Sequence, residues 1–173
     1  QTLKALTNAL NKRVEFALAD EQGIVDDSVQ PFGAVAPALA GLALPELALS
    51  GDAVRARWLG WARELGAEKN KTPQKAADAV VDAFADDVGL GERLAGLRKA
   101  FFVASEDRLT QHLGKYPAAQ AAEAELQTVL LAVRQHEAWQ HQQRMARLSR
   151  VLLDQFRALK RERGWVDMND VEG

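Results

Sequence analysis

The feature that most constrains the fold of this chain is a helical pattern that runs from Pro117 to Gly164 without a helix-breaking residue. The pattern covers about 47 residues, which as one α-helix would extend roughly 70 Å at 1.5 Å per residue. The regular spacing of apolar residues along this pattern is interrupted between Arg134 and Arg144, so a sustained coiled coil is not expected. Any fold of this chain must therefore accommodate one very long C-terminal helix.

The composition favours helix in the rest of the chain as well. Ala, Leu, Glu, Gln, Arg and Lys dominate, whereas Ile and Tyr each occur once, as Ile24 and Tyr116. Strand-forming residues are too sparse for a sheet. A chain of 173 residues without cysteine has the size of one ordinary domain and can bury a core without disulfides. We expect an all-α, irregular multi-helix domain over 1–173.

Apolar spacing and capping residues predict the shorter helices. We expect helices from Thr2 to about Leu18, within 33–44, over about 51–65 with Ser50 as N-cap, from Thr72-Pro73 through Ala85, and over about 92–100. The run at 101–103 is the one segment with extended character. The inward faces are predicted to consist of Val54, Trp58, Trp61 and Leu65 in one helix, and of Val80, Val81 and Phe84 in the next.

The sequence contains none of the motifs by which catalytic and cofactor sites are commonly recognised. The patterns GxxxxGK[ST], GxGxxG, GxSxG and HExxH are all missing. His136 and His141 stand five residues apart, about 500° around a helix, so they do not share a face as metal ligands would. No apolar run reaches the 18–20 or so residues of a membrane span. We therefore expect this chain alone to have no catalytic residue, no metal site, no cofactor and no membrane partner.

The net charge of −2 hides a strong segregation of charge. Between Val14 and Leu49 there are six acidic residues and no basic one. From 144 to 163 seven basic residues stand against two acidic ones; the basic ones are Arg144, Arg147, Arg150, Arg157, Lys160, Arg161 and Arg163. We call these seven residues the basic ridge. A row of positive charges along a helix can contact successive phosphates of a nucleic acid. The alternative is a solvated helix face, or a set of partners for the acidic N-terminal segment. The loop with Lys69, Lys71 and Lys75 is a smaller patch with the same ambiguity.

The C-terminal 156–172 segment is the most distinctive stretch, and it ends in Asp167-Met168-Asn169-Asp170-Val171. It resembles a recurrent segment of UvrD/Rep-type superfamily 1 DNA helicases, in which a long helix leads through a turn into a D-F-x-D-L-like signature. The similarity is strongest to helicase–nucleases of the RecB and AddA type. Met168 replaces the usual Phe of that signature, and Val171 replaces the usual Leu. The runs at 97–103 and 12–16 are compatible with the same family.

The resemblance implies that the chain is the helical accessory subdomain called 1B, which is inserted into the first motor domain of such a helicase. Residues 165–173 would begin the return into the motor domain. The residues that bind ATP and Mg would then belong to the parent and lie outside this chain. The parent would be a bacterial cytoplasmic, ATP-dependent DNA helicase or exonuclease in double-strand-break repair and recombination. The implied partners are DNA, the remaining domains of the parent and a second subunit.

Two hypotheses of function follow. The first is a non-catalytic subdomain that guides DNA by contacting its backbone. Its candidate DNA-binding residues, chosen on charge alone, are Arg144, Arg147, Arg150, Arg157, Lys160, Arg161, Lys69 and Lys71. The second is a helical protein–protein interaction module without a nucleic-acid role. It would dock a partner through Trp139, which stands among polar neighbours, and through the stripe Leu126, Val129, Leu130 and Val133. Burial of that stripe within the chain would leave no groove for the partner.

Overall fold

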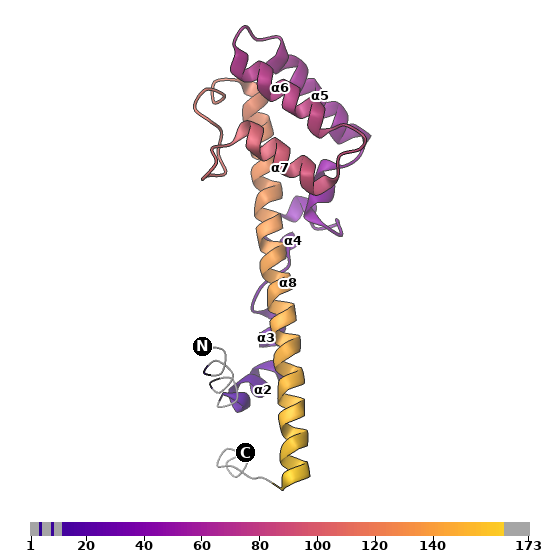
Figure 1. Ribbon diagram of the computed structural model, residues 1–173, viewed down its shortest axis with the longest axis vertical. Helices are drawn as coiled ribbons and strands as arrows, with labels where there is room; N and C mark the ends of the chain where they lie inside the picture. Colours follow the sequence, from indigo (N-terminus) through magenta and orange to yellow (C-terminus); the bar gives the residue numbers. More distant parts are fainter. Residues whose placement is uncertain (1–3, 5–7, 9–11, 165–173) are drawn as a thin grey trace. The chain divides into compact units, whose positions relative to one another are not determined.

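The computed structural model describes Lys4, Asn8 and residues 12–164, and the regular elements among these residues are helices (Figure 1). In chain order they are α2 (Arg13–Glu21), α3 (Ile24–Asp27), α4 (Phe32–Val35), η1 (Pro37–Leu39), η2 (Pro45–Leu49), α5 (Asp52–Gly66), α6 (Lys71–Ala83), α7 (Leu90–Phe101) and α8 (Pro117–Arg163). An isolated antiparallel bridge joins Phe102 to Leu109, at the run predicted to be extended. The predicted all-α class is confirmed.

The long C-terminal helix has the bounds that the sequence predicts. α8 begins at Pro117 and continues for 47 residues. Proline suits the first turn of a helix because the amide that it lacks would have no partner there. Gly164 follows with a φ of 64°, a left-handed conformation that glycine adopts without steric cost and that commonly terminates helices.

The contacts divide the chain into two compact units, and the single domain over 1–173 stays a prediction. Unit 1 comprises Gln1–Gln30 with Glu137–Gly173, and unit 2 comprises Pro31–His136. α8 contributes residues to both units.

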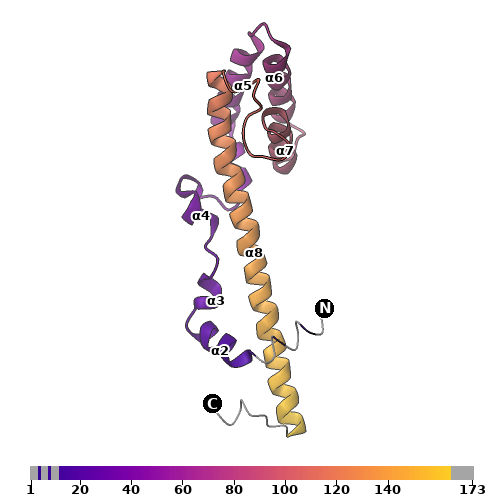
Figure 2. The same ribbon diagram turned by 90° about the vertical axis from the view of Figure 1, so that its left-hand side faces the viewer.

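The core of unit 2 is built by α5, α6, α7 and the part of α8 that belongs to this unit (Figure 2). Trp58 of α5 is fully buried at its centre, with ring centroids 5.0 Å from Trp61, 5.8 Å from Phe84 and 6.0 Å from Phe101. The Trp58 indole donates a hydrogen bond of 3.1 Å to Glu125 of α8. α5 is thereby connected to α8 by both apolar and polar contacts.

The predicted apolar faces are mostly correct, with one clear error. Trp58 and Leu65 are buried, and Val54 and Trp61 pack against the core from partly exposed positions. In α6, Val80 is buried, but Val81 is 54% exposed. Successive helical residues are turned by about 100°, so Val81 lies beyond the edge of the face that Val80 presents to the core.

Two predicted helix starts are also wrong. Ser50 is not the N-cap of α5, because its hydroxyl donates a 2.6 Å hydrogen bond to the Leu47 carbonyl of the preceding 3-10 turn. Gly51, with a φ of 93°, is the N-cap instead. α6 begins at Lys71 after the N-cap Asn70, so that Pro73 is its third residue rather than its first.

The N-terminal half of the chain contains shorter helices than the sequence predicts. The single helix expected within 33–44 is replaced by α4 and η1, because Pro37 cannot continue the hydrogen-bonding pattern of α4. The helix expected from Thr2 to Leu18 is described at Lys4, at Asn8 and in α2, which extends to Glu21.

In unit 1, α2 and α3 pack beside α8 (Figures 1 and 2). Ala146 and Leu153 of α8 are buried there, with 2% and 8% of their surface exposed. The Arg13 guanidinium lies 5.3 Å from the centre of the Phe156 ring, and Gln142 donates a 2.9 Å hydrogen bond to the Val25 carbonyl. Polar contacts therefore make up much of the packing in unit 1.

Candidate nucleic-acid interface

All five lysines of unit 2 are exposed, and none forms an ion pair with a described residue. They come from four places in the sequence: Lys69 precedes α6, Lys71 and Lys75 belong to its first turns, Lys99 lies in the last turn of α7, and Lys115 precedes α8. Their ammonium groups are therefore available for an anionic partner.

Two neighbouring hollows bring four of these lysines together. The first, of about 580 Å³, is lined by Asn70, Lys71, Thr72, Pro73, Gln111, His112, Lys115 and Tyr116. The second, of about 440 Å³, is lined by Thr72, Lys75, Ala76, Ala79, Gly96, Lys99, Ala100, Thr110 and His112. Because the two share Thr72 and His112, they form one continuous surface, and its lining contains no acidic residue.

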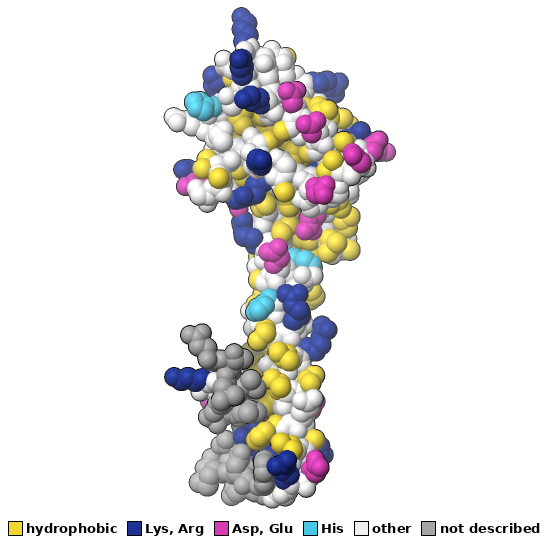
Figure 3. Space-filling model, viewed as in Figure 1, with side chains coloured by type: hydrophobic (Ala, Val, Ile, Leu, Met, Phe, Trp, Pro, Cys, Tyr) yellow, Lys and Arg dark blue, Asp and Glu magenta, His cyan; other side chains and the backbone are white. Residues whose placement is uncertain are grey.

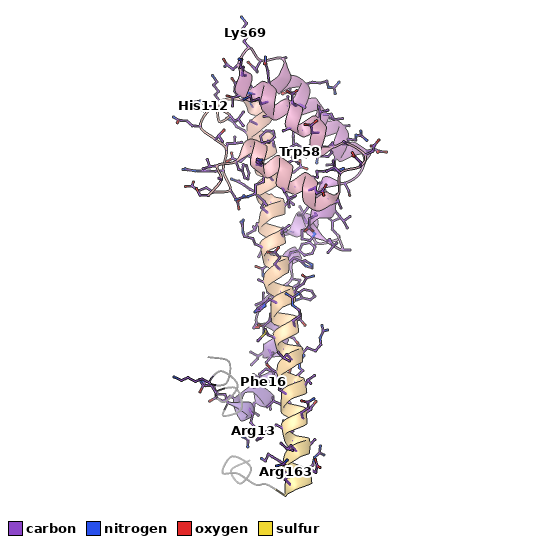
Figure 4. The ribbon with its side chains drawn as sticks, viewed as in Figure 1. Arg13, Phe16, Trp58, Lys69, His112 and Arg163 are labelled. Atoms are coloured by element: carbon purple, nitrogen blue, oxygen red, sulfur yellow. The ribbon has the colours of Figure 1, made fainter. Side chains whose placement is uncertain are left out.

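We call this region the lysine surface; it consists of the lining residues Lys71, Lys75, Lys99, Lys115 and His112, together with Lys69, which stands two residues before Lys71 in the chain. Figure 4 shows Lys69 at the tip of the turn between α5 and α6, with His112 on the neighbouring loop. The space-filling view shows further Lys and Arg side chains around this end of unit 2 (Figure 3). The surface thus has one sign of charge and a hollowed shape.

Neutral hydrogen bonds hold the backbone of the lysine surface in place. The Asn70 amide donates to the Tyr116 hydroxyl at 2.9 Å, which joins the start of α6 to the segment before α8. Gln74 donates to the Glu68 carbonyl at 2.7 Å, and Gln120 donates to the Gly114 carbonyl at 2.7 Å. The lysines are not used in these hydrogen bonds; Lys115 lies 5.2 Å from the centre of the Tyr116 ring, and its charge is not neutralised by that contact.

Asp107 anchors the loop that carries His112 and Lys115. Its carboxylate accepts a hydrogen bond of 2.9 Å from Arg98 of α7 and another from Arg134 of α8. Burial raises the pKa of the Asp107 carboxyl, but the two guanidinium groups outweigh that effect and hold the pKa below its ordinary value. The loop is therefore fixed to helices on both of its sides.

Most arginines of unit 2, unlike its lysines, are occupied. Arg55 pairs with Asp86 at 2.7 Å, Arg57 pairs with Glu125 at 2.8 Å, and Arg108 pairs with Glu106. Arg93 donates to the carbonyls of Ala83 and Leu49 and lies 4.6 Å from the centre of the Phe84 ring. The net charge of this unit therefore says little about which of its cations can meet a ligand.

The basic ridge of α8 in unit 1 is only partly available. Arg150 donates hydrogen bonds to Asp20 and lies 3.0 Å from Asp26, so its guanidinium is already engaged. The Arg150 hydrogen bond lowers the pKa of the Asp20 carboxyl, and the two carboxylates raise the pKa of Arg150. For Arg150 the structure therefore agrees with the alternative interpretation, in which the basic residues of the ridge form ion pairs with the acidic N-terminal segment.

The other ridge residues differ in their surroundings. Arg144, Arg147 and Arg161 are exposed and form no ion pair with a described residue. Arg157 lies 3.8 Å from Asp154, and Lys160 lies 5.5 Å from the centre of the Phe156 ring. Three exposed arginines therefore remain as candidate DNA-binding residues in unit 1, in addition to Lys69 and Lys71 in unit 2.

The stripe proposed as a protein-docking groove is part of the core of unit 2. Leu126, Val129 and Leu130 have 0%, 1% and 8% of their surface exposed, and Val133 packs against the same core. No partner groove remains there. Trp139, in unit 1, is half-buried. Among the large apolar side chains of α8, Leu131 is exposed beside the stripe, and Met145, Leu148, Val151 and Leu159 are exposed further along the helix. Figure 3 shows hydrophobic side chains at the surface along this helix.

Metal and membrane chemistry give no competing site in the described part of the chain. Lys4, Asn8 and residues 12–164 contain no group of three His, Asp or Glu residues that could hold a metal ion. Within the same residues, no helix is both long and apolar enough to cross a membrane.

No protein-family model, curated protein or solved structure significantly matches this chain. The helicase resemblance thus stays a prediction. Its signature residues, Asp167, Met168, Asn169, Asp170 and Val171, lie outside the described residues, as does the predicted return into a motor domain at 165–173.

Sequence reasoning found only part of the lysine surface. It singled out Lys69, Lys71 and Lys75, which are neighbours in the chain. It missed Lys99, Lys115 and His112, which stand between 24 and 40 residues further along and join the first three only through the packing of α6, α7 and the loop before α8.

Proposed function

We propose that this chain is a non-catalytic accessory subdomain that guides DNA in an ATP-dependent helicase or helicase–nuclease of the UvrD/Rep type. The observation that carries the DNA-binding part of the proposal is the lysine surface, where cations without acidic partners line two adjoining hollows. The helicase part rests on the similarity of the 156–172 segment to that family.

Lysine side chains suit a partner that must be held without regard to sequence. An ammonium group is a point charge on a flexible stem, and it binds phosphate without the fixed geometry of a guanidinium. Backbone contacts position a nucleic acid but do not read its bases. The surface is therefore suited to a strand that slides past it, as a motor protein requires.

The strength of this binding should depend steeply on salt. Each phosphate neutralised releases condensed counterions, which contributes about 0.7 to the logarithmic salt slope for single strands and about 0.9 for duplex. If the five lysines each met one phosphate, the slope would be about −3.5 to −4.5. The exposed Arg144, Arg147 and Arg161 of unit 1 would add to this value if they met the same DNA.

The proposal is tested by fluorescence anisotropy with a forked DNA at low salt. One variant changes Lys71, Lys75, Lys99 and Lys115 to Gln. We expect binding at least about tenfold weaker and a salt slope that falls in magnitude by about 3, since four contacts are lost. The matched control changes four positive residues outside the surface to Gln: Lys12, Arg55, Arg63 and Arg108. Its exposed ion pairs contribute little to stability.

The control should retain nearly all of the affinity. Equal losses in both variants would assign the effect to net charge alone and would contradict a defined surface. Binding that ignores salt would contradict backbone recognition altogether.

A protein–protein interaction module is the second candidate, and one observation favours it. Met145, Leu148 and Val151 of α8 are 46%, 51% and 50% exposed, which is unusual for three large apolar side chains spaced three residues apart on one helix. Under this alternative, light scattering should show that the chain self-associates, or that it forms a complex when the parent's other domains are added. Leu148→Glu should abolish either association. A monomer whose affinity for DNA is unchanged by Leu148→Glu would count against the alternative.

A further inference from the structure

The larger of the two hollows differs from the rest of the lysine surface in its lining. Every ionisable side chain around it is a base, apart from Tyr116, and the neutral groups include the amide or hydroxyl donors Asn70, Thr72 and Gln111. The second hollow is lined mostly by alanine and glycine around its lysines. The second hollow does carry Thr72, Thr110 and His112 beside its lysines. In the first hollow, every lining residue except Pro73 has a polar or charged side chain, so charge and donors are most concentrated there.

We propose that this first hollow is a binding site for one phosphate group of a nucleic acid, held by Lys71, His112 and Lys115. The identity of the phosphate's carrier rests on the proposed function, whereas the phosphate chemistry follows from the lining itself. Phosphate presents several acceptor oxygens and no donor at full ionisation, so it requires a site made of cations and donors. The hollow supplies both and presents no carboxylate that would repel the ligand.

The site is formed by two segments that the fold holds together. Lys71 comes from the first turn of α6, and His112 and Lys115 come from the turn at 111–115. The 2.9 Å hydrogen bond between Asn70 and Tyr116 joins these segments directly behind the hollow. Leu113, 1% exposed, anchors the turn in the core. Little backbone ordering is then needed when a ligand binds, which favours affinity.

The local backbone adds to the positive potential. Asn70 is the N-cap of α6, but no side-chain oxygen caps this helix, and the Asn70 Nδ2 donates instead to the Tyr116 hydroxyl. Uncapped first-turn amides and the helix dipole favour a negative charge nearby. This contribution supports the lysines but would not define a site without them.

The size of the hollow indicates more than a bare ion. Its volume of about 580 Å³ lies within the range of roughly 300–1,000 Å³ usual for small-ligand sites. It therefore has room for a phosphate together with the sugar to which the phosphate is attached. The ligand class is accordingly a nucleotide unit, either within a DNA backbone or at a phosphorylated strand end.

The first experiment uses inorganic phosphate as the probe. Amide chemical shifts of the whole chain are followed by NMR while phosphate is added at constant ionic strength. We expect saturable shifts confined to the amides of 70–72 and 111–116. They should vanish in the double variant Lys71→Gln with Lys115→Gln and persist in the matched double variant Lys75→Gln with Lys99→Gln. Shifts that never saturate, or that are lost equally in both variants, would overturn the proposal.

The second experiment measures single-stranded DNA binding by the same two variants. A defined phosphate site predicts a loss about tenfold larger in the Lys71 and Lys115 variant, the effect of roughly one hydrogen bond to a charged group. A purely diffuse surface predicts equal losses, and that result would also overturn the proposal. The bound phosphate could belong to a strand end or to the backbone, and strands with a 5′-phosphate and with a 5′-hydroxyl distinguish these two sources. Tighter binding of the 5′-phosphorylated strand assigns the site to a strand end, and equal binding assigns it to the backbone.

Failure of this inference and failure of the proposed function have different signatures. If the wild-type chain binds DNA while inorganic phosphate gives no saturable shifts, the phosphate site is wrong and DNA guiding stands. If phosphate gives the expected shifts while no DNA binds at low salt, the site is supported and DNA guiding is wrong.

Discussion

Trp58 is the residue whose replacement tests the described packing of unit 2 most directly. Its ring is fully buried against three other aromatic rings, and its indole N–H donates to Glu125 across to α8. Trp58→Ala removes both kinds of contact. Trp58→Phe keeps an aromatic ring but removes the hydrogen bond and part of the buried ring volume, so its cost combines the polar contribution with a small apolar one.

The magnitudes follow from these contacts. Truncating a fully buried aromatic side chain to alanine costs about 3–5 kcal/mol. Trp58→Phe should cost about 1.5–3 kcal/mol, the usual contribution of a hydrogen bond to a charged group. The lower part of that range is favoured here, because Glu125 keeps two hydrogen bonds from Arg57, of 3.1 and 2.8 Å, and is not left unsatisfied.

The assay is urea unfolding followed by far-UV circular dichroism, with hydrogen exchange of the α5 amides as a readout specific to unit 2. Trp61→Phe is the matched control, since Trp61 is partly exposed on the same helix; its cost should stay below about 1.5 kcal/mol. The reasoning would be refuted by Trp58→Ala costing less than Trp61→Phe. It would also be refuted by Trp58→Phe having no effect on α5 exchange.

Four further predictions concern backbone space and ion pairs. Gly60→Ala in the middle of α5 should stabilise by about 0.5–1 kcal/mol in urea unfolding, because an added Cβ meets nothing within 4 Å. Gly33→Ala should instead destabilise by about 1–3 kcal/mol, because its Cβ would lie 2.9 Å from that of Ala40. The Asp107 pKa is below its ordinary 3.8 in the folded chain, so stability should fall as the pH drops below about 4, and less so in Asp107→Asn. Arg150→Gln should speed proteolysis at 20–30 while leaving unit 2 unchanged, since its partners are Asp20 and Asp26.

The outcomes that would contradict these predictions are equally specific. A destabilised Gly60→Ala would mean that α5 has a neighbour at that position. An Asp107→Asn variant with the same acid sensitivity as wild type would assign the pH dependence to other carboxylates. Protection of 20–30 that survives Arg150→Gln would show that apolar contacts alone hold α2 and α3.

The longer helices α5 to α8 were predictable from local sequence, because helix formation depends on residues three and four positions apart, whereas α3 and η2 were not predicted. α8 was placed at both ends by a proline and a glycine, and the lack of strand-forming residues was enough for the all-α class. The errors at Ser50 and Val81 are also local in origin. A serine hydroxyl can bond backward as well as forward, and a residue at the edge of a helix face can turn either way.

The choice of partners was decided by the tertiary structure alone. Charge counting made Arg150 a candidate for DNA, but Asp20 and Asp26, more than a hundred residues away in sequence, occupy its guanidinium. Packing likewise buried the stripe that begins at Leu126 and left Met145 and Leu148 exposed on the same helix. The amino-acid sequence was enough to predict the all-α class, the longer helices and the charge that each segment carries. Only the fold brought Lys99 and Lys115 beside Lys71 and left all three without an acid, because ion pairing and hollows depend on distances in space rather than on positions along the chain.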